Sequence, residues 1–120
     1  VPLELAYAVM QVESGFTPAA RSSTGDYGLM QINSINAGWL KDKLGITDLL
    51  DARQNIQAGC YMLGMYFSEY EGNVNCALMA YNLGTAGAKK AWSAGTYSTA
   101  YTDKVWNAMV GLLEGERDVS

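Results

Sequence analysis

One carboxylate stands on what the sequence predicts to be an apolar helix face. Glu13 follows Ala6 and Val9 at the three-and-four spacing that places residues on one side of a helix. That side normally packs into a core, where a carboxylate loses the hydration of its charged form. We therefore expect the pKa of Glu13 to be raised, as a general acid near neutral pH requires. The alternative is a surface glutamate at a helix end, and residues 9–16 alone leave both open.

The composition narrows the chemistry that could surround this acid. The chain has 120 residues, 49% of them hydrophobic and 17% charged, which is typical of one globular domain. It contains no histidine, so Ser-His-Asp triads, Cys-His pairs and HExxH zinc sites are excluded. Two cysteines are too few for a four-cysteine zinc site. If the chain is an enzyme, carboxylates are its expected acid–base groups.

Charge and hydropathy indicate which partners to expect. The net charge of -4 argues against a nucleic-acid partner, which would call for a basic patch. No stretch reaches the roughly 18 to 20 apolar residues that a membrane span needs. The chain starts at Val1 without a methionine, so we expect a domain excised from a longer protein.

The first half of the chain reads as one helix followed by loops. The helix is expected from about Pro2 to Ser14, and Gly15 and Pro18 supply its stop signals. Residues 17–27 are rich in small, turn-forming residues and predict a loop. Residues 28–33 could be a strand or a helical turn, and we favour a short helix or irregular segment. Short helical turns are expected over 34–40 and 47–50.

The second half predicts longer helices with clear end signals. The longest is expected over 52–70, with Asp51 as its N-cap, and Asn73 can cap the next. Residues 82–84 break that helix, a short helix follows over 86–92, and Ser98 or Thr99 caps the last one. The chain is therefore predicted to be an all-α single domain over residues 1–114, with a polar, frayed tail over 115–120.

Amides and aromatic rings stand near the predicted ends of these elements. Gln31 closes the 28–33 segment together with Asn33, and Tyr81 precedes Asn82 at a helix break. Amides pair with the hydroxyl and N-acetyl groups of sugars, and pyranose faces lie on rings. The amides could instead cap turns, and tyrosines at helical spacing more often belong to a core. Each signal is weak when taken alone.

In order, these signals match a known family. The blocks are Glu13-Ser14-Gly15, then residues 28–33 (Gly-Leu-Met-Gln-Ile-Asn), then Asn55 with Ala58-Gly59, then residues 80–84 (Ala-Tyr-Asn-Leu-Gly), then Tyr101 with Lys104-Val105. The ordered set resembles the SLT-type lytic transglycosylase domain, a branch of the lysozyme-like superfamily, over roughly residues 2–110. The resemblance implies an all-α, lysozyme-like fold with a substrate groove.

The resemblance also implies roles for single residues. Glu13 matches the family's catalytic glutamate, and Ser14 matches a serine that orients the sugar beside it. Tyr101 matches a tyrosine near the acid. Glu13 would protonate the oxygen of the bond between N-acetylmuramic acid and N-acetylglucosamine. It would then act as base on the C6 hydroxyl of the muramic acid, which closes a 1,6-anhydro ring without water. Four further positions match residues that line the groove: Met30, Gln31, Tyr81 and Asn82.

The same resemblance implies a setting. The partner would be the glycan strands of peptidoglycan, and no metal or organic cofactor is implied. The location would be extracytoplasmic, in the cell wall, the periplasm or secreted, or else phage-associated. Glu13 is expected to lie mostly buried at the floor of a groove lined by residues that include Gln31, Tyr81, Asn82 and Tyr101.

Two alternatives to this reaction stay open. Residues 26–34 also resemble the segment of animal-type lysozymes that carries their second carboxylate, so Asp26 is a candidate second carboxylate for a hydrolytic muramidase. Asp26 could equally be a turn residue that bonds to its own loop backbone. The other alternative is a non-catalytic domain that only binds glycan. Cys60 and Cys76 could form a disulfide or remain two free thiols.

Overall fold

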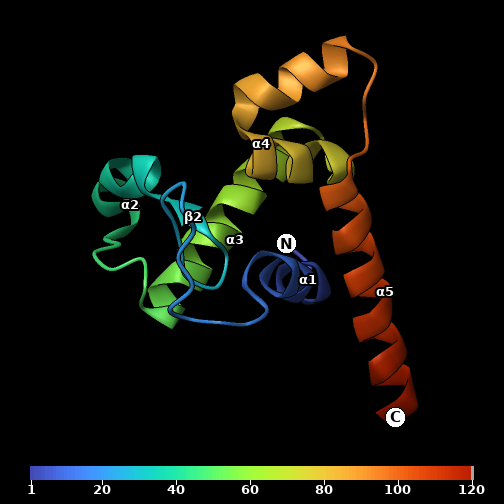
Figure 1. Cartoon of the computed structure of the whole chain (residues 1–120), viewed down its shortest axis with the longest axis horizontal. Coiled ribbons are helices and arrows are strands. Elements are labelled where there is room, and N and C mark those ends of the chain that lie inside the picture. Colours follow the sequence, from blue (N-terminus) through green and yellow to red (C-terminus); the bar gives the residue numbers. More distant parts are fainter. Residues whose placement is uncertain (120) are drawn as a thin grey trace. The chain divides into compact units, whose positions relative to one another are not determined.

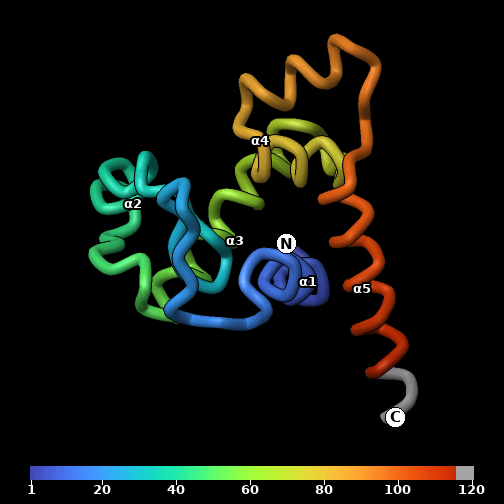
Figure 2. The backbone as a smooth tube through the Cα atoms, in the orientation of Figure 1, coloured from blue at the N-terminus to red at the C-terminus, as the bar shows by residue number. Residues whose placement is uncertain are grey.

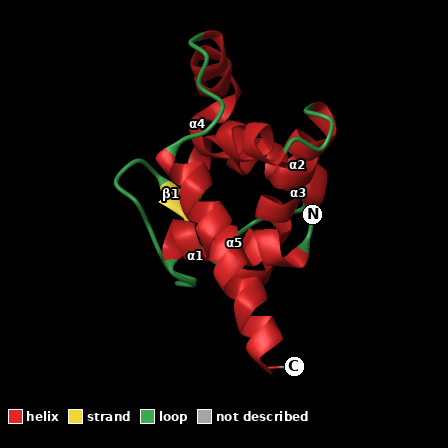
Figure 3. Ribbon diagram, turned by 90° about the vertical axis from the view of Figure 1, so that its right-hand side faces the viewer, coloured by secondary structure: helices red, strands yellow, loops and turns green. Residues whose placement is uncertain are grey.

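Helices form most of the chain (Figure 1). The structure is a computed structural model that describes the backbone of residues 1–119 and the side chains of residues 1–115. Its α-helices are α1 (Leu3–Ser14), α2 (Ala37–Leu44), α3 (Ala52–Glu69), α4 (Val74–Ser93) and α5 (Ala100–Val119). Only two strands of two residues each are present over residues 1–119, and Figure 3 shows how little of the chain they take up. The predicted all-α class is confirmed.

The chain divides into two compact units. One, here called the loop unit, is Val9–Tyr61 and contains most of the irregular backbone. The other, the helical unit, combines Val1–Ala8 with the described residues from Met62 on. Helices α1 and α3 each contribute residues to both units.

Helix α1 ends where the sequence predicts. The N–H of Gly15 donates to Gln11 O at 3.0 Å, and that of Phe16 donates to Met10 O at 3.4 Å. Both residues have positive φ, at 59° and 61°, and the backbone therefore turns out of the helix. Glu13 consequently lies in the last turn of α1.

Residues 26–33 form a small hairpin, and the helix or irregular segment favoured for 28–33 is wrong for its second half. Strand β1 (Asp26–Tyr27) pairs antiparallel with β2 (Ile32–Asn33), with Asp26 opposite Asn33. The turn between them contains Gly28 at φ 81° and Gln31 at φ 50°. Positive φ reverses the chain direction, and strands of two residues are too short to show an alternating pattern.

The helical turn predicted over residues 47–50 is also absent. The side chain of Gln54 accepts hydrogen bonds from the N–H groups of Thr47 at 2.7 Å and Asp48 at 3.3 Å, and a single turn follows in which Asp51 N–H donates to Asp48 O at 3.2 Å. The other predicted segment, 34–40, is helical: the short 3₁₀ turn η1 (Ser34–Asn36) leads directly into α2.

The predicted helix caps are confirmed. Asp51 Oδ2 accepts from Gln54 N–H at 3.0 Å at the start of α3. Asn73 Oδ1 accepts from Cys76 N–H at 3.0 Å at the start of α4. Thr99 Oγ1 accepts from Thr102 N–H at 3.2 Å at the start of α5.

Two helices differ in length from their prediction. The break expected at residues 82–84 is a kink at Gly84, at φ 76° and ψ 161°, after which α4 continues in a new direction (Figure 2). Helix α5 runs on to Val119, into the segment 115–120 predicted as a tail. Residue 120, at the end of that predicted tail, lies outside the described residues.

The kink is packed in one hydrophobic cluster. Residues from both halves of α4 belong to it, and Tyr70, just after α3, contacts Trp92 of the second half edge to face, with ring centroids 4.9 Å apart. This packing holds the bend that Gly84 allows. The cluster contains Met79, Ala80, Ala88, Tyr66, Tyr70, Ala91 and Trp92.

Two further sequence questions are answered in part. Among the described residues, none of the helices combines the length and hydropathy that crossing a bilayer takes. Cys60 and Cys76 are both free thiols, which is one of the two states that the sequence left open.

We expect Asn73→Ala to lower the free energy of unfolding by about 1 kcal/mol, because α4 loses its side-chain cap. Urea denaturation of the two proteins measures this difference. Asn107→Ala is a matched control, since Asn107 is exposed within α5 and caps no helix. Equal stability of the Asn73 and Asn107 variants would contradict the assigned cap.

Candidate active site

Glu13 has the raised pKa that its place on an apolar face predicts. Its side chain is partly buried in the last turn of α1. The pKa of Glu13 is raised from 4.5 to about 7, mainly by desolvation on burial and, to a smaller extent, by the negative charge of Asp26. The carboxyl can therefore be protonated near neutral pH, and burial rather than a partner residue is the main reason.

Asp26 lies in the opposite electrostatic state. Its Oδ2 accepts from Ser22 Oγ at 2.6 Å and from Thr24 Oγ1 at 2.7 Å, and its Oδ1 accepts from Asn33 Nδ2 at 3.0 Å. Desolvation alone would raise the pKa of Asp26, but these three hydrogen bonds outweigh it and lower the pKa. Asp26 is therefore held as a carboxylate.

The two acids form a pair with separated proton affinities. Asp26 keeps its charge, and that charge disfavours ionisation of Glu13. A protonated and an ionised carboxyl that interact electrostatically can divide the roles of acid and charge stabiliser. Both belong to the loop unit, so this pairing exists within one compact body.

Ser14 connects α1 to the hairpin. Its hydroxyl donates to Leu29 O at 2.7 Å, with Met10 O a second acceptor at 3.1 Å. It also accepts from the N–H of Thr17 at 3.2 Å. These bonds fasten the end of α1, and with it Glu13, to the turn that follows Asp26. The predicted contact between Ser14 and a sugar stays a prediction.

Gln31 closes the same turn from the other side. Its Nε2 donates to Gly28 O at 3.0 Å and to Ala20 O at 3.2 Å, which holds the preceding loop against the hairpin. Both bonds are donated by the amide nitrogen of Gln31, and the side-chain oxygen takes part in neither of them. Gln31 is partly buried and keeps a positive φ of 50° in this position.

Asn55 supports the turn from α3. Fully buried, it accepts from the N–H of Met30 at 2.8 Å and donates to Tyr27 O and Leu49 O, both at 2.7 Å. All three bonds reach backbone groups in or next to the hairpin and in the segment before α3. Gly28 is required here, because a Cβ would overlap Asn55 Nδ2 and would lie 2.6 Å from Leu49 O.

Met30, predicted to line a groove, is fully buried. A Cβ on Gly59 would overlap the Met30 sulfur, so the glycine in α3 makes room for this side chain. Met30 therefore supports the hairpin turn by packing its side chain against α3.

Three predicted residues belong to the helical unit. Tyr81 is partly buried near the kink of α4, and Asn82 beside it is exposed. Tyr101 is partly buried in the first turn of α5. Their expected place in one groove with Glu13 stays a prediction.

The bonding of Asp26 and Asn55 was missed by sequence reasoning. The turn-cap alternative holds for Asn33, whose Oδ1 accepts from Ile35 N–H at 3.0 Å while its amide nitrogen bonds Asp26. The hydroxyl-rich run Ser22 to Thr24 before Asp26 was a usable signal for a carboxylate that is held ionised by hydrogen bonds.

In the described residues, no group of three or more His, Cys, Asp or Glu side chains could hold a metal ion.

The chain is similar in sequence to proteins named as transglycosylases. The sequence model of the family described as "Transglycosylase SLT domain" matches residues 1–105. The transglycosylase of Enterobacteria phage PRD1 is 40% identical over 111 residues, which cover 92% of this chain and 38% of the phage protein. The membrane-bound lytic murein transglycosylase F of Desulfosudis oleivorans is 39% identical over 83 residues, covering 64% of this chain and 17% of that protein.

A solved structure is similar in fold. It is an inactive mutant of the lytic transglycosylase Slt from Pseudomonas aeruginosa, with a TM-score of 0.67 and 27% identity over 89% of this chain and 18% of that one. This chain thus spans 38% or less of the length of each of these three proteins.

Asp26→Asn should lower the pKa of Glu13, because removing a nearby negative charge makes ionisation of Glu13 easier. The pKa should stay above 4.5, since desolvation is the larger cause. Carbon-13 NMR titration of the Glu13 carboxyl measures the change. Asp42→Asn, which removes an exposed carboxylate from α2 of the same unit, should leave Glu13 unchanged. A Glu13 pKa that stays constant in Asp26→Asn would disprove the interaction.

Proposed function

The chain belongs to the transglycosylase SLT domain family, and from this premise we propose that it is a peptidoglycan lytic transglycosylase with Glu13 as general acid and base. The observation that carries the proposal is the raised pKa of Glu13 beside an ionised Asp26. A single carboxyl that is protonated near neutral pH can give a proton first and take one back later. The names of the phage and bacterial relatives agree with this activity.

Two proton transfers make up the proposed reaction. Glu13 donates its proton to the oxygen that links N-acetylmuramic acid to N-acetylglucosamine, and the bond from that oxygen to C1 breaks. The Glu13 carboxylate then takes the proton of the muramic acid C6 hydroxyl, whose oxygen bonds to C1. The product is a 1,6-anhydro ring, no water is consumed, and Glu13 is protonated again.

We assign Asp26 a supporting role in this reaction. Positive charge develops at C1 as the bond breaks. A carboxylate held ionised by three hydrogen bonds needs no reorganisation to stabilise that charge. The same bonds use both carboxylate oxygens, which favours electrostatic support over attack on C1.

The remaining predicted residues fall into two groups. Ser14 and Met30 would act through the hairpin turn, because the Ser14 hydroxyl donates to Leu29 O and the Met30 N–H donates to Asn55. The other four would contact sugar, through the side-chain oxygen of Gln31 and through Tyr81, Asn82 and Tyr101 of the helical unit. A chain of this length relative to its relatives would be one domain of a longer protein. We infer an extracytoplasmic or phage-associated location from the same relatives.

Hydrolysis by a muramidase is the second candidate function. The ionised Asp26 favours it, because two carboxyls with separated pKa values also suit a hydrolytic mechanism. The products distinguish the two reactions, since hydrolysis adds one water for each cleaved bond and the transglycosylase reaction adds none. A domain that only binds glycan would give neither product.

We expect mass spectrometry of fragments released from purified peptidoglycan to show anhydromuramic ends, one water lighter than hydrolytic ends. Glu13→Gln should reduce release at least about a hundredfold, because the general acid is lost. Glu69→Gln, an exposed position on α3, serves as the matched control and should keep full activity. Hydrolytic, reducing muramic acid ends would show that the chain is a muramidase. An active Glu13→Gln protein would show that another group is the acid.

The pH dependence of kcat/KM should follow Glu13. Because the acid must be protonated in the free enzyme, kcat/KM should fall about tenfold per pH unit above the Glu13 pKa, which is about 7. Asp26→Asn should move this limb to lower pH, in the direction of the Glu13 pKa. If the fall of kcat/KM stays at the same pH in Asp26→Asn while the Glu13 pKa moves, a group other than Glu13 controls the pH dependence.

A further inference from the structure

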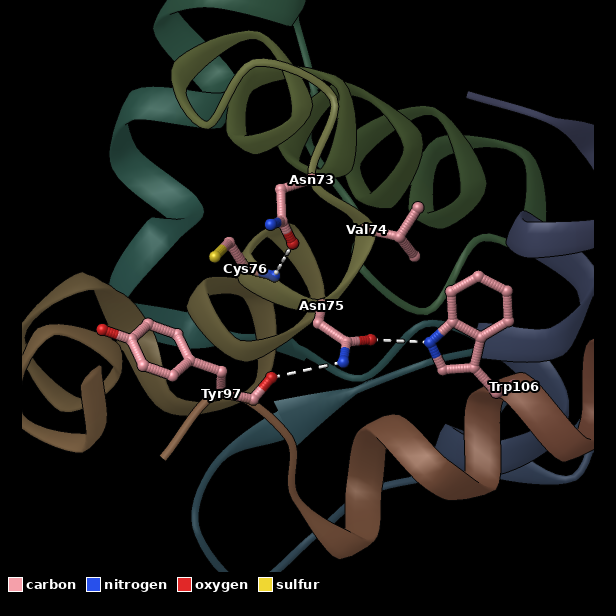
Figure 4. A pocket seen from close by; sticks show the side chains of 6 residues that line it. All are labelled: Asn73, Val74, Asn75, Cys76, Tyr97 and Trp106. Atoms are coloured by element: carbon pink, nitrogen blue, oxygen red, sulfur yellow. Dashed lines mark hydrogen bonds between the residues drawn. The ribbon is translucent and has the colours of Figure 1, made fainter. Parts of the chain in front are cut away.

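The helical unit contains a pocket that none of the predicted site residues lines. Its volume is about 350 Å³, within the range of small-molecule sites. Three segments build it: the first turn of α4, the loop before α5, and α5 itself (Figure 4). The lining residues are Asn73, Val74, Asn75, Cys76, Tyr97 and Trp106.

Asn75 holds the pocket together. Its Oδ1 accepts from Trp106 Nε1 at 2.6 Å, and its Nδ2 donates to Tyr97 O at 3.2 Å, as Figure 4 shows. One amide thus ties both the loop and α5 to the start of α4. The plane of the indole is fixed before any ligand arrives, which lowers the entropy lost on binding.

The lining has the chemistry of a neutral ligand with apolar faces. Trp106 is 39% exposed and Tyr97 is 58% exposed, so both keep ring surface in water. None of the six lining residues carries a formal charge. Two of the lining residues, Val74 and Asn75, stand in the first turn of α4, where backbone N–H groups have no helical carbonyl one turn earlier to bond.

An N-acetylated hexosamine matches these groups together. The CH face of its pyranose ring stacks on an aromatic ring, and its acetamido oxygen accepts a backbone N–H. A purely apolar ligand would leave the N–H groups unused, and a strongly charged ligand would normally meet a charged side chain.

We propose that this pocket is a second carbohydrate site, which binds one N-acetylated hexosamine unit of a glycan strand against Trp106 and Tyr97. The ligand class follows from the lining alone. Its use in holding substrate rests on the proposed function, where a second contact on the strand would slow dissociation between cleavage events.

The test uses the whole chain carrying Glu13→Gln, so that the probe is not cleaved, labelled with nitrogen-15. The probe is tetra-N-acetylchitotetraose, four linked N-acetylglucosamine units. The Trp106 indole N–H signal, assigned among the three tryptophans by substitution, should move and saturate during titration. A Trp106 signal that does not respond overturns the proposal.

Tyr97→Ala removes an exposed ring and should weaken the affinity measured at Trp106 about tenfold. Tyr7→Ala is the matched control, because Tyr7 is 42% exposed on α1 and does not line the pocket. Equal affinities of the two variants overturn the proposal.

The acetamido requirement is tested with cellotetraose, which has the same linkage without N-acetyl groups. It should move the Trp106 signal only weakly. If cellotetraose binds as well as the N-acetylated probe, or if only a stem peptide such as L-alanyl-D-isoglutamine moves the signal, the assigned ligand class is wrong.

These results are independent of the cleavage assay. With Glu13 intact, Tyr97→Ala should slow release from whole peptidoglycan and leave the masses of the products unchanged. A Trp106 response in a chain that cleaves nothing would reject the proposed function and keep the second site. Anhydro products with a silent Trp106 would do the reverse.

Discussion

The buried amide of Asn55 is the interaction on which the loop unit depends. It bonds three backbone groups, the N–H of Met30 and the carbonyls of Tyr27 and Leu49, and so supports a tight turn inside the unit. Gly28 leaves the space that this amide occupies. Without that support, the hairpin that carries Asp26 and Gln31 would have no fixed place.

The two carboxyls differ because their surroundings differ. Glu13 lies on a helix among apolar residues and has little to compensate the loss of water. Asp26 lies on a strand of the hairpin and receives three side-chain hydrogen bonds. Ser14 joins the two elements, so the end of α1 and the hairpin are positioned as one piece. The proposed chemistry uses this difference in charge state directly.

Side-chain amides have the same structural use in the helical unit. Asn73 caps α4, and Asn75, two residues further, connects α4 to the loop and to α5. Each amide offers a donor and an acceptor on one rigid plane, so it can hold two segments at a set distance. In both units, fixed amides therefore present the surfaces at which we place ligand chemistry.

Local signals in the sequence determined most of the helices, their caps at Asp51, Asn73 and Thr99, and the break at Gly84. Each of these effects acts within about one helical turn, so neighbouring residues suffice to predict it. Only the tertiary structure decided the burial that raises the Glu13 pKa, the support of the hairpin turn by Asn55 and the pocket at Trp106. Asn55 bonds Met30 across 25 positions, and Trp106 bonds Asn75 across 31. No spacing in the sequence encodes such pairs, because they form only after the chain has brought distant segments together.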